Sequence, residues 1–122
     1  MLVEILKPDF VFHDERGSLF QLASKEIGQV NYVLSEKGAV RGNFHYHKLN
    51  DESFFVISGE VIVSLACDGI EESYTFRAGD MFLIRKGISH TFRYVERTEL
   101  IVFYDKGVEL EDGRKDIIAA ST

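Results

Sequence analysis

Residues 45 to 59 read HYHKLNDESFFVISG, a strand-forming run that brings three potential metal ligands close together. His45 and His47 are two apart in a predicted strand, so both side chains leave the same face, with Cα atoms about 6.6 Å apart. Residues 48–51 can turn the chain and place Glu52 at the start of a returning strand, beside the two imidazoles. The stretch therefore predicts a hairpin that holds two histidines and one carboxylate around one ion.

A second segment, further along the chain, supplies a fourth candidate ligand. Gly79, Gly87 and His90 are spaced as G-x7-G-x2-H, and His90 opens another predicted strand. A single histidine in a strand is usually hydrogen bonded or on the surface, and a single glutamate is usually exposed. Three of the chain's four histidines nevertheless fall in these two segments, which favours a metal site. The fourth, His13, is expected on the surface.

The apolar residues of the chain recur at every second position or in short runs rich in Val, Ile and Phe. Turn residues separate the runs, notably at 58–60, 67–70 and 78–80. Many short strands with tight turns favour an all-β sandwich or closed barrel. Residues 1–122 are predicted to form a single domain, with the tail after Lys106 as a short edge strand, a helical turn or a frayed end. The predicted strands are 10–13, 18–22, 30–34, 42–46, 53–57, 60–65, 73–77, 81–84, 90–94 and 100–104.

Composition and charge exclude several classes of function. The 122 residues include no apolar run approaching the ~18 residues of a membrane-spanning helix. Because of the missing apolar run, no membrane is expected as a partner. A net charge of −6, from 20 acidic and 14 basic residues, would repel a phosphate backbone, so no nucleic acid is expected either. The chain opens without the basic and apolar regions of a leader peptide, so a cytoplasmic location is expected. Cys67 is the only cysteine, which excludes an internal disulfide and favours a role in the core.

The two ligand-bearing segments resemble the two motifs of the cupin superfamily. The pattern HxHx4Ex6G at 45–59 is similar to the first motif, and Gx5RxGx2H at 79–90 is similar to the second. Arg85 and Tyr94 stand where cupins commonly have a proline and an asparagine, but neither is a ligand position. The resemblance implies a cupin double-stranded β-helix, which is a jelly-roll barrel. It also implies one divalent ion, of a kind suited to nitrogen and oxygen ligands such as Zn, Mn, Fe, Ni or Cu. The implied metal ligands are His45, His47, Glu52 and His90.

Two further stretches resemble cupins of deoxysugar and capsular polysaccharide biosynthesis. They are DERG at 14–17 and VRGN at 40–43. Such cupins include the 3,5-epimerases and 3,4-ketoisomerases of deoxythymidine diphosphate sugars and the carboxy-terminal domain of capsule-assembly reductases. The resemblance implies that Arg16 helps hold a sugar nucleotide and that His45 is a general base. Arg41 is a second candidate for the diphosphate, which guanidinium groups suit. In the alternative interpretation, Arg16 caps a turn and Arg41 is a solvated surface charge.

The chain departs from the metal-free epimerases at the ligand positions. Those enzymes have a glutamine near His47 and a lysine near Glu52, where this chain has potential ligands. Tyr104 lies near the end of the last predicted strand but out of register with their second acid–base residue. The metal-bearing capsule-type cupins are therefore the closer resemblance.

These observations predict an isomerase or epimerase that acts next to the ketone of a nucleotide-linked sugar. Arg16 and Arg41 are expected at the rim of the metal cavity, and Arg93 is a further candidate. A binding module that senses or stores a small sugar or acid, and a metal-dependent dioxygenase, are the alternatives. A homodimer is expected because the strands at 10–13 and 18–22 leave an edge that a second chain can cover.

Overall fold

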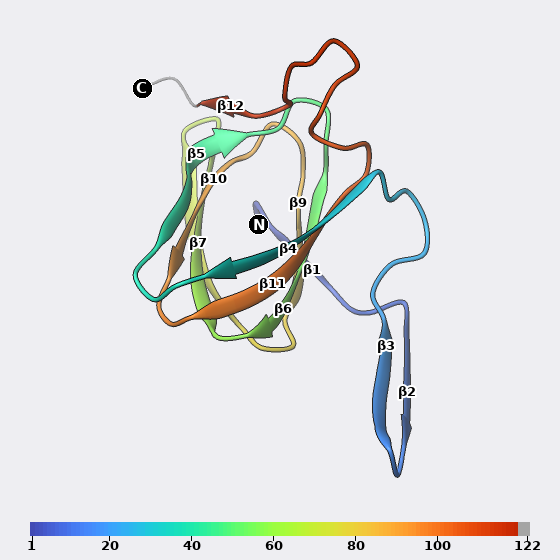
Figure 1. Ribbon diagram of the computed structural model, residues 1–122. Helices are drawn as coiled ribbons and strands as arrows, with labels where there is room; N and C mark the ends of the chain where they lie inside the picture. The colour runs from blue at the N-terminus through green and yellow to red at the C-terminus, as the bar shows by residue number, and fades with distance from the viewer. Residues whose placement is uncertain (120–122) are drawn as a thin grey trace.

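Strands make up the regular secondary structure of the computed structural model, which describes residues 1–119 (Figure 1). The all-β prediction is confirmed. No helix of this part of the chain is long and apolar enough to cross a membrane. The strands are β1 (Glu4–Leu6), β2 (Phe10–Asp14), β3 (Gly17–Gln21), β4 (Gln29–Ser35), β5 (Val40–Tyr46), β6 (Glu52–Ser58), β7 (Glu60–Cys67), β8 (Ile70–Arg77), β9 (Met81–Ile84), β10 (Ser89–Tyr94), β11 (Thr98–Tyr104) and β12 (Ile118–Ala119).

Two antiparallel five-stranded sheets form the barrel. The first has the order β1-β9-β6-β11-β4 and the second has the order β12-β5-β10-β7-β8. The hairpin of β2 and β3 belongs to neither sheet and projects away from the barrel (Figure 1). The barrel therefore has an inner space between two sheets, and the chain places one exposed arm outside it.

The core fills the space between the sheets because apolar residues alternate along the strands. On β7, Val61, Val63 and Leu65 are fully buried while the residues between them are partly exposed. Three phenylalanines stack at the centre: the rings of Phe76 and Phe82 lie 3.9 Å apart at 9°, and Phe54 lies 4.9 Å from Phe82. The apolar core does not extend to one end of the barrel, where the buried side chains are polar.

All ten predicted strands are present, most of them with ends within two residues of the prediction. Strand β8 begins three residues early because Asp68 and Gly69 form a two-residue turn directly after β7, with φ of +50° and +79°. Positive φ at both positions is what this tight hairpin turn requires. The short β1 was not predicted, and β12 shows that the tail contains an edge strand. Cys67 was expected in the core but is only partly buried, at the end of β7.

Gly59 makes the turn between β6 and β7 and has no room for a side chain. Its φ is +93°, and a Cβ atom there would lie 2.4 Å from Thr98 Oγ1 and 2.5 Å from the carbonyl oxygen of Arg97. The turn is therefore closed by direct packing of backbone against β11.

Replacing Gly59 by Ala should lower the free energy of unfolding by about 2 to 5 kcal/mol, since a steric clash adds to the cost of a positive φ. The matched control is Gly69→Ala, which also has a positive φ but no atom within 4 Å of the added Cβ. The control should lose only about 1 to 2 kcal/mol. Guanidinium denaturation measures both, and equal losses would contradict the role of the clash.

Candidate metal centre

The two ligand-bearing segments meet at the polar end of the barrel. Strands β5 and β10 are neighbours, and His45 lies directly opposite His90. The backbone N–H of Gly87 donates a hydrogen bond of 2.7 Å to the carbonyl oxygen of His47. The glycine of the second segment therefore fixes the backbone at the second histidine of the first.

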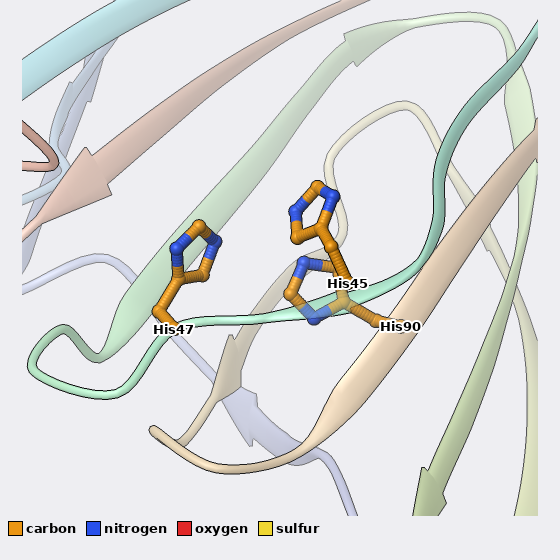
Figure 2. Close-up of side chains that lie close together, drawn as sticks. All are labelled: His45, His47 and His90. Carbon is orange, nitrogen blue, oxygen red and sulfur yellow. The ribbon is translucent and has the colours of Figure 1, made fainter. Parts of the chain in front are cut away.

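The three predicted histidines point toward one another (Figure 2). One ring nitrogen of each of His45, His47 and His90 lies within 4.8 Å of the others. The ring of His45 is 4.6 Å from that of His90 and 5.1 Å from that of His47. Nitrogen atoms at these separations are close enough to share one cation.

Glu52, at the start of β6, completes the predicted set of four. Its carboxylate is buried, and Oε1 lies 2.6 Å from His47 Nε2 and 3.3 Å from His90 Nε2. The His47–Glu52 pair has the distance of an ion pair but not the alignment of a hydrogen bond. His47 Nε2 and Glu52 Oε1 thus stay buried without a hydrogen-bond partner among the described residues. Buried polar atoms are nearly always paired, so two adjacent unpaired atoms fit a site built for a cation.

An irregular stretch of β5 turns His45 into the site. Gly42, Asn43 and Phe44 have φ of +100°, +39° and +57°. A step of two positions on β10, from His90 to Phe92, pairs with a step of four positions on β5, from His45 to Arg41. Strand β5 therefore bulges at this point. A positive φ is unusual for a bulky residue such as Phe44, and strain of this kind is found at functional sites.

The histidines differ in their protonation. Burial, followed by the charges of the other two histidines, lowers the pKa of His45 to about 4. Burial also lowers the pKa of His90. At His47 burial opposes the charged form, but the adjacent carboxylate of Glu52 outweighs it and raises the pKa. His45 and His90 are therefore neutral at physiological pH and offer a free lone pair, as metal ligands do.

The centre opens into a cavity of about 120 Å³ between the two sheets. Tyr104 lines it, and the ring of Tyr104 lies 5.6 Å from that of His47. Burial and the carboxylate of Glu52 raise the pKa of Tyr104, so its hydroxyl keeps its proton. The lining residues are Val33, Arg41, Gly42, His45, Glu52, Phe54, His90, Phe92, Tyr94, Leu100, Val102 and Tyr104.

The two predicted substrate-binding arginines lie in different places. Arg41 lines the cavity and is held at the end of β4, where Nε donates to Ser35 Oγ at 2.8 Å and Nη2 to the carbonyl oxygen of Leu34 at 3.3 Å. Arg16 lies at the tip of the β2–β3 hairpin, where Nε donates to Asp14 at 2.9 Å and most of the side chain is exposed. Within a single chain, Arg41 therefore lines the cavity as predicted, whereas Arg16 does not lie at its rim.

Other residues near the site were not predicted. Tyr104, set aside for its register, lines the cavity. Asn50 and Asp116 are buried beside His47, although they stand 66 residues apart in the sequence. No local pattern marks this pair, because its partners lie so far along the chain. His13, by contrast, is exposed on β2, as predicted.

Comparison with known proteins identifies the family. A family model described as a cupin domain matches residues 31–104, which include all four predicted ligands. The chain belongs to the cupin family. The jelly-roll prediction is thereby confirmed, since it rested on resemblance to this family. The match begins near β4 and ends with β11, so the cupin core excludes both the β2–β3 hairpin and the tail.

Proteins similar to this cupin include a polysaccharide biosynthesis protein and sugar ketoisomerases. It is 29% identical to the spore coat polysaccharide biosynthesis protein SpsL of Bacillus subtilis (strain 168), over 75% of this chain and 70% of that protein. Its fold is similar to the TDP-quinovose 3,4-ketoisomerase WlaRB of Campylobacter jejuni, with a TM-score of 0.82, 21% identity and coverage of 97% of this chain and 92% of the other.

A further structure with the same fold was solved with a sugar nucleotide. It is a mutant of the 3,4-ketoisomerase QdtA of Thermoanaerobacterium thermosaccharolyticum, in complex with TDP-4-keto-6-deoxyglucose. The TM-score is 0.79 at 19% identity, over 98% of this chain and 88% of that one.

Proposed function

We propose that this cupin is a metal-dependent isomerase or epimerase of a nucleotide-linked keto sugar. The observation that carries the proposal is the cavity in which His45, His90 and Glu52 face Arg41. The cavity therefore contains both potential metal ligands and a guanidinium group that can bind a phosphate. The names of the structurally similar ketoisomerases and of the spore coat relative support a sugar nucleotide as the substrate.

The divalent ion would be held by three imidazole nitrogens and one carboxylate oxygen. The unpaired atoms His47 Nε2 and Glu52 Oε1 support this assignment, and the ligand set suits Zn, Mn, Fe, Ni or Cu. When bound, such an ion supplies Lewis acidity beside a carbonyl oxygen, which makes the adjacent C–H easier to deprotonate.

Two cavity residues can move a proton. His45 is neutral, as a general base must be, and Tyr104 is protonated, as a general acid must be. A histidine nitrogen that binds an ion cannot accept a proton at the same time. With the ion bound, His45 would serve as a ligand, a water in the cavity would accept the C–H proton, and Tyr104 would return a proton to the substrate. Without the ion, His45 is the base that resemblance to the epimerases implies.

The size of the cavity bears on how the substrate would bind. At about 120 Å³ it is smaller than the ~300 Å³ at which pockets for drug-sized ligands begin. A sugar ring would enter while the nucleotide stays outside. The diphosphate then lies beside Arg41, whose guanidinium can donate to two phosphate oxygens.

The β2–β3 hairpin supports a homodimer. Phe10, Phe12, Leu19 and Phe20 are large apolar side chains that stay about half exposed on this arm. A projecting apolar hairpin is a surface that a second copy of the chain can cover. We place Arg16, at its tip, near the cavity of the partner subunit.

Replacing His47 by Ala should sharply lower the metal content, because one of four ligands is lost. Elemental analysis of protein purified without added metal should find about one divalent ion per parent chain and much less in the variant. The matched control is His13→Ala, which removes the exposed fourth histidine and should leave the metal content unchanged. An equal metal content in His47→Ala and the parent would refute the metal assignment.

Replacing Arg41 by Ala should weaken the binding of a deoxythymidine or uridine diphosphate sugar by about 1.5 to 3 kcal/mol, the size of a charged hydrogen bond. Arg93→Ala is the control, since Arg93 is exposed on β10 and does not line the cavity. Titration calorimetry compares them. Equal affinity in the parent and Arg41→Ala would count against the sugar-nucleotide substrate.

Sedimentation velocity at micromolar concentration should give twice the chain mass of 13.9 kDa. Phe12→Asp should shift the protein toward the monomer, because a charge would be buried in the interface. Ile70→Asp, at an equally exposed position on β8, should not. A parent that sediments only at 13.9 kDa would refute the dimer.

A further inference from the structure

The C-terminal segment, residues 105–119, lies across the polar end of the barrel. Its last strand β12 lies beside β5 (Figure 1). The two strands pair at the ligand-bearing end of β5, with Ala119 opposite His45 and Ile118 opposite Tyr46. Val108 is buried, and the N–H of Asp116 donates to its carbonyl oxygen. This segment follows the part of the chain that the cupin model matches. It is therefore an addition to the cupin core that reaches the candidate metal centre.

Asp116 is buried and binds the loop that follows His47. Its carboxylate accepts hydrogen bonds from the backbone N–H groups of Lys48 and Leu49, both at 2.9 Å, and from Asn50 Nδ2 at 2.8 Å. Three donors satisfy a buried carboxylate, which would otherwise be costly to remove from water. The position of the loop therefore depends on a side chain from the other end of the chain.

Asn50 strengthens the same connection from the side of the loop. It is fully buried, and its Oδ1 accepts hydrogen bonds from the N–H groups of Lys106 and Gly107, at 3.0 and 2.8 Å. Its Nδ2 also donates to the carbonyl oxygen of Gly107 at 2.8 Å. The loop and the segment thus form one buried polar network in which each of these groups is paired.

The network reaches the His47 ring itself. Nδ1 of His47 lies 2.5 Å from the backbone carbonyl oxygen of Asp116. A carbonyl oxygen can only accept a hydrogen bond, so Nδ1 carries the proton. The other nitrogen, Nε2, is the one that faces Glu52. A hydrogen bond of this kind fixes which nitrogen of a histidine is available to a metal, and in which direction it points.

We infer that Asp116 is a positioning residue for the metal centre, which acts through His47. Its carboxylate holds the loop and its carbonyl oxygen orients the ring, so that Nε2 faces the other three ligands. The inference rests on the metal centre proposed above. Metal binding and docking of residues 105–119 are then coupled in both directions. If docking of the segment raises the metal affinity by some factor, bound metal raises the equilibrium constant for docking by the same factor.

The test is the affinity for Zn²⁺, measured by competition with a chromophoric chelator. Asp116→Ala should bind Zn²⁺ about 10- to 100-fold more weakly, because without the carboxylate the loop after His47 no longer holds the Asp116 carbonyl oxygen against the ring that it orients. Asp112→Ala is the matched control, because it removes an exposed carboxylate from the same segment, one that pairs with Arg114. It should bind as the parent does. Parent-like affinity in Asp116→Ala would overturn the inference.

A double-mutant cycle separates positioning from a general loss of structure. If Asp116 acts through His47, adding Asp116→Ala to His47→Ala should weaken Zn²⁺ binding no further. Additive losses would overturn the inference. Parent-like affinity in His47→Ala alone would instead refute the metal centre, so the two failures are distinguishable.

Amide hydrogen exchange of the unmodified chain provides a test that does not depend on a variant that folds. Zn²⁺ should slow exchange at the N–H groups of Lys48 and Leu49, which donate to Asp116, and at that of Asp116 itself. Amides on the distant β8 serve as the reference. Unchanged exchange at the three amides in a Zn²⁺-loaded protein would overturn the inference.

Discussion

A carboxylate buried among imidazoles is the constraint on which the polar end of this barrel depends. Glu52 is buried, and its Oε1 lies 2.6 Å from His47 Nε2 and 3.3 Å from His90 Nε2. A buried negative charge must be compensated, by a protonated histidine or by a cation. The raised pKa of His47 favours compensation by a protonated histidine. The unpaired atoms His47 Nε2 and Glu52 Oε1 fit compensation by a bound cation.

The barrel satisfies this constraint by joining three separate pieces of backbone. Strand β10 places His90 opposite His45, the Gly87 N–H holds the carbonyl oxygen of His47, and β6 brings Glu52 from the facing sheet. The bulge in β5 carries the conformational cost, with a phenylalanine at positive φ.

Features of the fold and site that depend on local spacing could be predicted from the sequence. The positions of His45, His47, Glu52 and His90 follow from strand periodicity and from the cupin motifs, and the turn at 67–70 from its Asp-Gly pair. Features that depend on distant partners could not. The short β1 is held by β9, the buried Asn50 and Asp116 satisfy each other across 66 residues, and Tyr104 reaches the cavity only because β11 lies beside β6. The same reasoning did not locate Arg16, because nothing local shows that β2 and β3 leave the barrel.

The hydrogen bond between His47 and Asp116 spans 69 positions and has a consequence for the order of assembly. Domains fold as the chain emerges from the ribosome, from the N-terminus onward, and a contact between distant residues closes late because a long loop must be ordered first. The barrel strands through β11 are complete by residue 104, whereas the partner of His47 is synthesised twelve positions later. The strands through β11 can therefore form the apolar core while this histidine is still free to rotate, and the ligand shell matures only after the segment that carries Asp116 has docked.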